Sequence, residues 1–213
     1  ATVRYYSKVL NKSIMKADGS GKGNAGNGFN YEDRTAVFRL DINEDGFDLT
    51  GADIFNNGEM KKLGKVTVVD TLPEGWSFVE LAEGIKYELY KADGTLVNDV
   101  SGILATEPTF AGRDGTFVFS DLSASSYILV KAQLAEEQYL EYGQANNELI
   151  TVTNRVVMSA EGDSKWKPSD NHNVTVNTKF LDKELISPGD NSNVLPKWTI
   201  YYNPYGLEAL KNI

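Results

Sequence analysis

Residues 65–80 read KVTVVDTLPEGWSFVE, and this stretch decides the fold. Val66 and Val68 recur at the two-residue period that is typical of a β-strand with one buried face. The strand ends at Asp70, and a corner that contains Pro73 follows, because proline and glycine favour turns. After the corner, the large side chains of Trp76 and Phe78 again alternate with smaller ones. The stretch therefore predicts two neighbouring strands of a β-sandwich.

Asp70 is the residue in this stretch that needs a physical explanation. A carboxylate among apolar positions is costly to bury unless it is paired or kept neutral. One interpretation is that Asp70 accepts hydrogen bonds from the backbone of the turn that follows, as Asp residues often do. The other is that its carboxyl group has a role inside the core, and the residue pattern alone leaves both open.

The composition restricts the classes of function. The chain has 213 residues, of which 41% are hydrophobic, enough for a substantial core. Its net charge of -9 disfavours nucleic acid and anionic membranes as partners, because neither is attracted to an acidic surface. The chain contains no Cys, which excludes disulfides, thiolate metal sites and cysteine nucleophiles. No apolar segment is long enough to span a bilayer, so we expect no membrane insertion.

Short alternating segments separated by turn residues continue along the chain and predict an all-β, immunoglobulin-like sandwich. One helical turn is expected within residues 49–64. The side chains expected in the core are Val66, Val68, Phe38, Leu40, Phe117 and Phe119. Besides residues 65–80, the expected strands lie at residues 1–15, 34–43, 85–97, 115–122, 126–135 and 147–159.

The end of the chain resembles its beginning. Residues 173–186 align without gaps on residues 2–15, which places Lys183 on Lys12. A second match places residues 197–210 on residues 37–50, with Trp198 on Phe38. Tandem modules of one kind are typical of stalks. We therefore expect one module at residues 1–160, a polar connector at 161–172, and the opening strands of a second, similar module at 173–213.

Motifs for metal binding and hydrolysis are incomplete. Asp41, Asn43 and Asp45 match the first half of a calcium loop, but apolar residues stand where later ligands are needed. They are a weak calcium candidate beside the alternative of a plain turn at a strand end. His172, the only histidine, falls in the expected connector, where no Ser-His-Asp triad or His-based metal site assembles around it. We therefore expect no cofactor and no enzyme activity.

A series of ordered landmarks runs through roughly residues 8–158. They are a lysine on the first strand (VLNKSI), an aromatic-led strand ending in Asn (VFRLDIN), the segment VTVVDTLPEGWSF, the strand KYELYKADGT and the last strand LITVTNRVVM. In this order the landmarks resemble the isopeptide-forming modules of Gram-positive surface proteins, as in collagen adhesins and the second-domain type of fimbrial shaft proteins. Members of that family join a first-strand Lys to a last-strand Asn.

The resemblance implies a spontaneous amide bond between Lys12 and Asn154, promoted by Asp70. Burial lowers the pKa of a lysine and so frees the amine for attack. A carboxylic acid kept neutral by the same burial can polarise the amide carbonyl and carry protons as ammonia leaves. The alternative is that Lys12 extends to solvent, Asn154 bonds to the backbone and Asp70 caps a turn.

Other residues are rival participants in this chemistry. Lys8, Lys16 and Asn177 are near enough in sequence to replace the lysine or the asparagine. Glu88 could replace Asp70 as the acid if the module uses the glutamate version of the reaction.

The resemblance implies a non-enzymatic structural module of an extracellular, cell-wall-anchored protein of a Gram-positive bacterium, either an adhesin or a pilus-like stalk. Its partners would be neighbouring modules of the same polypeptide. The alternative is a ligand-binding module for a host glycan or matrix protein, with contacts from Trp166, Trp198 or the loop at 17–30.

Overall fold

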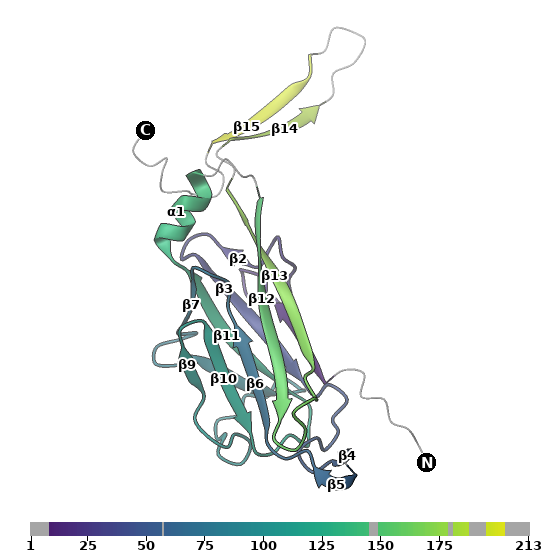
Figure 1. Cartoon of the computed structure of the whole chain (residues 1–213). Helices are drawn as coiled ribbons and strands as arrows, with labels where there is room; N and C mark the ends of the chain where they lie inside the picture. The colour runs from purple at the N-terminus through teal and green to yellow at the C-terminus, as the bar shows by residue number, and fades with distance from the viewer. Residues whose placement is uncertain (1–8, 57, 145–148, 179–180, 188–194, 203–213) are drawn as a thin grey trace.

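The computed structural model describes residues 9–56, 58–144, 149–178, 181–187 and 195–202, and its main body is a sandwich of two antiparallel sheets (Figure 1). Six strands form the first sheet: β1 (Leu10–Ile14), β2 (Phe29–Asn30), β3 (Thr35–Ile42), β7 (Trp76–Val79), β8 (Tyr87–Lys91) and β11 (Ser126–Leu134). Five strands form the second: β6 (Val66–Thr71), β9 (Thr109–Ala111), β10 (Asp114–Phe119), β12 (Leu149–Ala160) and β13 (Ser169–Asn177). The remaining elements are β4 (Asp53–Asn56), β5 (Glu59–Lys62), α1 (Glu136–Gln144), β14 (Leu181–Ser187) and β15 (Lys197–Tyr202).

The strand order places β1 and β13 at one side of the sandwich. The first sheet runs β1-β3-β11-β7, with β2 paired to β3 and β8 paired to β11. The second sheet runs β13-β12-β6-β10-β9, so β6 is its middle strand. The two edge strands β1 and β13 also contact each other across the gap between the sheets. The predicted all-β, immunoglobulin-like sandwich is therefore confirmed.

The predicted core is also confirmed. Residues at the even positions of β6 face inward and are buried, and those between them are half-buried, as the period of two requires. All six predicted core side chains are fully buried: Val66, Val68, Phe38, Leu40, Phe117 and Phe119. The inward faces of the two sheets thus supply one continuous apolar core.

The prediction of a helical turn within residues 49–64 is wrong. This segment forms the hairpin of β4 and β5, in which Asp53 pairs with Lys62. Gly58 lies in its turn with φ 87°, a conformation that glycine adopts without a steric penalty. The one helix among the described residues is α1, at the end of the sandwich where Tyr139 packs near Phe29 (Figure 1). No helix in this part of the chain is long and apolar enough to cross a membrane.

The end of the first sandwich lies beyond the predicted boundary at residue 160. β13 pairs with β12 over nine residues, from Val157 opposite Ser169 to Leu149 opposite Asn177. Two of its side chains, Val174 and Val176, are buried in the sandwich core. The expected connector at 161–172 is therefore partly the turn between these two strands and partly β13 itself. The connector prediction missed this strand because its first half, SDNHN, is polar and its apolar alternation begins only at Val174.

The hairpin of β14 and β15 has the same register as β1 and β3. Lys12 lies opposite Leu40 and Ile14 opposite Phe38, while Lys183 lies opposite Ile200 and Leu185 opposite Trp198. The sequence matches between the end and the beginning of the chain place the same residues on one another: Lys183 on Lys12 and Trp198 on Phe38. In both strand pairs the lysine amine also lies over the aromatic ring, Lys12 over Phe38 at 4.9 Å and Lys183 over Trp198 at 4.2 Å.

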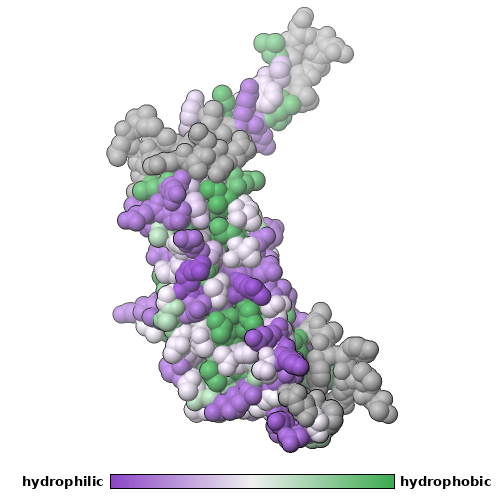
Figure 2. Space-filling model, in the orientation of Figure 1, coloured by the Kyte–Doolittle hydropathy of each residue, from purple (hydrophilic) through white to green (hydrophobic). Residues whose placement is uncertain are grey.

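The two strand pairs differ in what covers them. Phe38 and Leu40 are 0% exposed because the second sheet packs on them, whereas Trp198 and Ile200 are 47% and 50% exposed. The hairpin of β14 and β15 stands apart from the sandwich, and hydrophobic side chains lie on its surface (Figure 2). Its two strands pair as β1 and β3 do at the edge of the sandwich, but no second sheet among the described residues packs on them.

Candidate site for an internal crosslink

Three polar side chains from three strands meet inside the sandwich. Lys12 is the middle residue of β1 in the first sheet, and Asp70 and Asn154 belong to β6 and β12 in the second sheet. Each occupies an inward position of its strand, so alternation directs all three to the core. The structure thus brings together the three residues that the family resemblance implied.

The distances define a buried cluster. Lys12 Nζ lies 2.5 Å from Asp70 Oδ1, and both side chains are 0% exposed. The Asn154 Nδ2 group donates to Asp70 Oδ2 at 3.5 Å, and Asn154 is also fully buried. Asp70 lies opposite Val156 on the neighbouring strand, so Asn154 is its diagonal neighbour two residues away. The carboxyl group of Asp70 therefore touches both the amine and the carboxamide.

Burial dominates the electrostatics of the cluster. It lowers the pKa of the Lys12 amine and raises the pKa of the Asp70 carboxyl, although the attraction between the two groups opposes both shifts. Both shifts favour the neutral amine and the neutral acid. These are the protonation states that let an amine attack a carbonyl beside a proton donor. The Phe38 ring, 4.9 Å from the amine, adds to the apolar surroundings.

Only one of the two polar groups in the Asn154 carboxamide has a hydrogen-bond partner. Its nitrogen faces Asp70, while its Oδ1 is buried without a hydrogen-bond partner. A buried carbonyl oxygen without a donor costs free energy. The same oxygen gains negative charge if a nucleophile adds to the carbonyl carbon.

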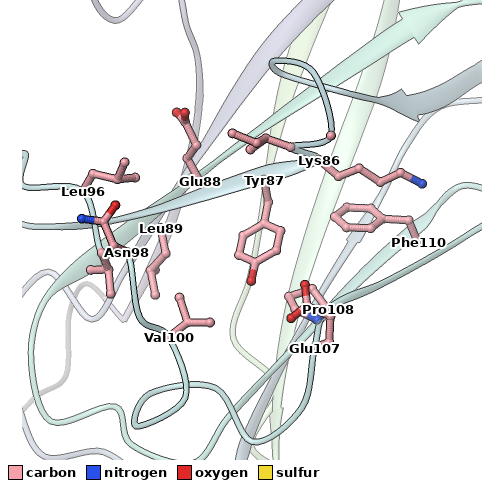
Figure 3. A pocket seen from close by; sticks show the side chains of 13 residues that line it. Lys86, Tyr87, Glu88, Leu89, Leu96, Asn98, Val100, Glu107, Pro108 and Phe110 are labelled. Atoms are coloured by element: carbon pink, nitrogen blue, oxygen red, sulfur yellow. The ribbon is translucent and has the colours of Figure 1, made fainter.

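Glu88, the alternative acid, lies elsewhere. It is on β8, opposite Leu129, while its neighbour Leu89 is the residue that faces the core. Its carboxylate accepts a hydrogen bond from Tyr90 Oη at 2.6 Å. Figure 3 shows Glu88 and Tyr87 on opposite sides of β8 beside a surface pocket. The structure does not bring Glu88 to Lys12.

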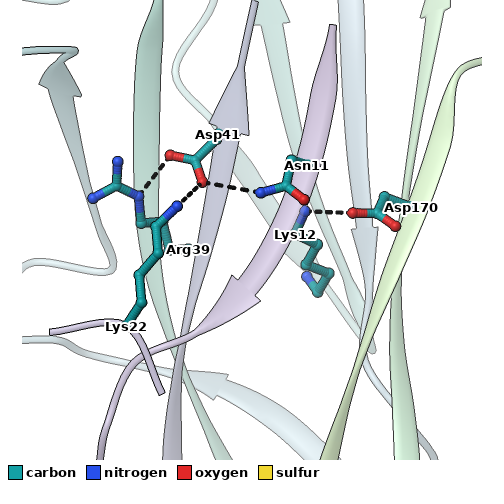
Figure 4. A network of polar contacts seen from close by, with 6 residues as sticks. All are labelled: Asn11, Lys12, Lys22, Arg39, Asp41 and Asp170. Carbon is teal, nitrogen blue, oxygen red and sulfur yellow. Dashed lines mark hydrogen bonds and ion pairs between the residues drawn. The ribbon is translucent and has the colours of Figure 1, made fainter. Parts of the chain in front are cut away.

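The residues of the weak calcium candidate, Asp41, Asn43 and Asp45, make other contacts than those of a calcium loop. The Asp41 carboxylate is paired with Lys22 at 2.7 Å and Arg39 at 2.6 Å, and the network extends to Asn11 (Figure 4). Two cations therefore already neutralise the oxygens that would bind calcium. The Asn43 side chain binds the Phe47 backbone, and its φ of 56° forms the strand-end turn. Asp45 completes this turn, and no group of three possible metal ligands occurs among the described residues.

Two rival residues of the crosslink, Lys16 and Asn177, lie away from the three-residue cluster. Lys16 lies after β1, in the turn where its backbone N–H binds Gly21. Asn177 lies at the end of β13 opposite Leu149, and its backbone N–H donates to the Tyr31 hydroxyl. Lys8 lies outside the described residues.

The sequence prediction missed two residues beside the cluster. Asp170 on β13 accepts the backbone N–H of Lys12 at 2.7 Å and so ties β1 to the second sheet (Figure 4). His172, which was expected in a connector, is the direct partner of Asn154 in the ladder between β12 and β13. The signal for both was the strand alternation of β13, which the polar composition concealed.

Comparisons with known proteins give a fold but no family. No family model and no curated protein matches the chain. The RrgA Jo.In complex has a TM-score of 0.51 and 14% identity over 81% of this chain and 82% of that one. The collagen-binding subdomain of the Enterococcus faecalis surface protein ACE has a TM-score of 0.45 and 12% identity, over 82% and 99% of the two chains. The major pilin subunit BcpA of Bacillus cereus has a TM-score of 0.45 and 13% identity, over 88% and 45%. At 14% identity, the likeness to the RrgA Jo.In complex shows a shared sandwich fold and nothing beyond the fold.

Proposed function

We propose that the chain is a structural module of an extracellular, cell-wall-anchored adhesin or pilus-like protein of a Gram-positive bacterium. Its sandwich is closed by a spontaneous amide bond between Lys12 and Asn154, which Asp70 promotes. The observation that carries this proposal is the meeting of the three side chains in a fully buried cluster, with the acid between the amine and the carboxamide. The module acts only on itself and turns over no substrate.

The position of the bond suits a protein under tension. It would link β1 of the first sheet to β12 of the second, and would close nearly the whole sandwich into one covalent loop. In the chain-entropy description of crosslinks, a loop of this length stabilises the folded state by about 5 kcal/mol. Force applied at the two ends of the sandwich would then bypass the strands between Lys12 and Asn154, while β13, which follows Asn154 in the chain, would be held by its pairing with β12.

The hairpin of β14 and β15 belongs, in this proposal, to a second module of the same kind. Its support is the shared register, in which Lys183 and Trp198 take the places of Lys12 and Phe38. Neighbouring modules of one polypeptide are then the first partners of the chain. The face that carries Trp198 and Ile200 is the one that an opposing sheet would cover.

The test of the crosslink is the intact mass of the purified chain. Formation of the bond releases one ammonia, so the mass should fall short of the sequence by one ammonia and no more. Fragmentation should yield one branched peptide that joins β1 to β12. The Asn154→Ala variant should have its full sequence mass, and an unshortened wild-type mass would rule out the bond.

A ligand-binding module is the second candidate, and a pocket at the opposite side of the sandwich favours it. The pocket has a volume of about 610 Å³ and lies between β8 and the segment around Phe110, with the Tyr87 ring in its wall (Figure 3). An aromatic wall with acidic groups such as Glu107 is suited to a sugar or a peptide. A screen against glycans and matrix proteins tests this role, and a Tyr87→Ala variant should lose any binding found. A pure spacer would bind nothing.

A further inference from the structure

His172 faces the same interior region as the crosslink cluster. It is the direct cross-strand partner of Asn154, and directly opposed residues of an antiparallel pair place their side chains on the same face of the sheet. Asp170, two residues earlier on that face, holds the backbone of Lys12. β13 therefore supplies the site with two polar side chains beyond the three that form the cluster.

Two buried polar atoms on these opposed residues lack hydrogen-bond partners. They are Oδ1 of Asn154, which is an acceptor, and Nε2 of His172, which is a donor when it carries the ring proton. Burial, and then the positive charge of Lys12, lower the pKa of His172, although the Asp170 carboxylate opposes the shift, and the net direction favours the neutral ring. An unpaired donor and an unpaired acceptor on directly opposed residues point to a contact that forms in another state of the molecule.

Asp70 does not supply the missing hydrogen bond to the carbonyl oxygen of Asn154. Asp70 Oδ2 accepts from the Nδ2 group of Asn154, so the acid stands beside the nitrogen that must leave as ammonia. Among the described residues, no hydrogen-bond donor reaches the carbonyl oxygen. That oxygen is where negative charge develops when the Lys12 amine adds to the carbonyl carbon, and a donor aimed at such an oxygen lowers the barrier.

We propose that His172 is a catalytic residue of the crosslinking reaction, and that its Nε2–H donates to Asn154 Oδ1 as the oxyanion forms. This inference rests on the proposed function. In this inference His172 stabilises Oδ1 of Asn154, and Asp70 transfers protons to and from Nδ2 of Asn154 and Nζ of Lys12.

The reaction then balances within these four side chains. A proton passes from the Lys12 ammonium to the Asp70 carboxylate, which leaves a neutral amine and a neutral acid. The amine lone pair forms the new C–N bond to Cγ of Asn154, and the carbonyl π pair moves to Oδ1, where His172 donates. Asp70 gives its proton to Nδ2 and takes one from Nζ. The carbonyl reforms, the old C–N bond breaks, and ammonia leaves with Asp70 protonated again.

The test uses a matched pair of substitutions in the full chain, His172→Gln and His172→Met. Gln and Met are similar in length and flexibility, but only Gln carries an N–H donor. Each chain is made by cell-free synthesis and quenched in acid denaturant at intervals, and the intact mass gives the rate of ammonia loss. His172→Met should slow the reaction on the order of 10²-fold, as loss of an oxyanion donor does, while His172→Gln should stay within about tenfold of the wild type. The control Asn171→Ala, at an exposed position of the same strand, should react at the wild-type rate.

Two further variants guard against an effect on folding. His172→Phe keeps a ring in place without the donor, and should be as slow as His172→Met. Each substitution is also placed in an Asp70→Asn background, where no bond forms in any chain, and the melting temperatures there should agree within a few degrees. Equal rates for Gln and Met, or a fast Phe variant, would mean that His172 only packs beside the site and would overturn its catalytic role. A wild-type chain that keeps its full mass would overturn the crosslink itself and this inference with it.

Discussion

Lys12 and Asp70 meet across the core of the sandwich, with Nζ 2.5 Å from Oδ1, although they belong to different sheets and lie 58 positions apart in the sequence. An ion pair in such a place is expensive, because both groups lose their hydration. Replacement of the pair by apolar residues would serve stability equally well. The burial of the pair is therefore weak evidence that it serves stability, and the proposed function gives it the role of a reactive pair.

Replacement of Asp70 should prevent the crosslink and leave the fold in place. We expect the Asp70→Ala and Asp70→Asn variants to have the full sequence mass, because the amine and the carboxamide, which both contact the Asp70 carboxyl group, are left without a proton carrier. Their melting temperatures should be roughly 10–20 °C lower than that of the wild type, the consequence of losing a crosslink worth about 5 kcal/mol. The matched control is Asp114→Asn, a neighbouring carboxylate on β10 that accepts from Thr71 and is exposed. This control should still lose ammonia. A shortened mass in Asp70→Asn would mean that another group promotes the bond.

Removal of the lysine should make stability depend on pH through Asp70. In the folded state burial raises the pKa of this carboxyl, and the Lys12→Met variant also removes the charge that opposes the shift. A group whose folded pKa is raised contributes stability below its unfolded pKa and loses it as the pH rises through the folded pKa. Lys12→Met should therefore become less stable as the pH rises above about 4.

The comparison for this measurement is the double variant Lys12→Met/Asp70→Asn. Neither chain can form the crosslink, so the difference between their melting temperatures isolates the carboxyl group. The single variant should lose stability relative to the double variant as the pH is raised. If their difference stayed constant from acid to neutral pH, Asp70 would not be desolvated as the structure shows.

The position of the domain boundary can be tested by truncation. A chain that ends after residue 178 keeps β13 and should show the wild-type loss of ammonia and the wild-type melting transition of the sandwich. A chain that ends at residue 160 lacks the buried side chains of Val174 and Val176, which alone stabilise the fold by about 3–6 kcal/mol. It also lacks the acceptor for the backbone of Lys12. We expect this shorter chain to melt more than 10 °C lower and to form little or no crosslink, as followed by circular dichroism and intact mass. Identical behaviour of the two truncations would place β13 outside the folding unit.

Metal removal should not affect stability. The carboxylate of Asp41 is already neutralised by Lys22 and Arg39, and this leaves calcium little to gain at the turn. Thermal melts recorded with a strong chelator and with added calcium should coincide within a degree or two. A clear rise in the melting temperature with calcium, absent in an Asp45→Ala variant, would restore the turn as a calcium site.

Local patterns were enough to predict the faces of the strands. In β6, Val66 and Val68 alternate with Thr67 and Val69, and the period of two places Val66 and Val68 together on the buried face. The same rule carried Asp70 into the core. Its partners Lys12 and Asn154 were predicted from a family resemblance, since nothing in their own strands says what lies across from them.

Local patterns failed where the outcome depended on a partner from another part of the chain. Residues 53–62 pair with each other instead of forming a helical turn, and Asp41 meets cations instead of a metal ion. The polar half of β13 was expected to be a connector, because half of an edge strand faces water and so resembles a linker in composition.

The sequence by itself determined which residues face inward, because alternation is a property of the chain and needs no neighbour. Only the tertiary structure decided that β1 and β12 bring Lys12 and Asn154 to the same carboxyl group, and that β13 brings His172 opposite Asn154. The physical reason is that strand pairing and sheet packing join residues that are distant in sequence, and the free energy of each such contact depends on both partners together.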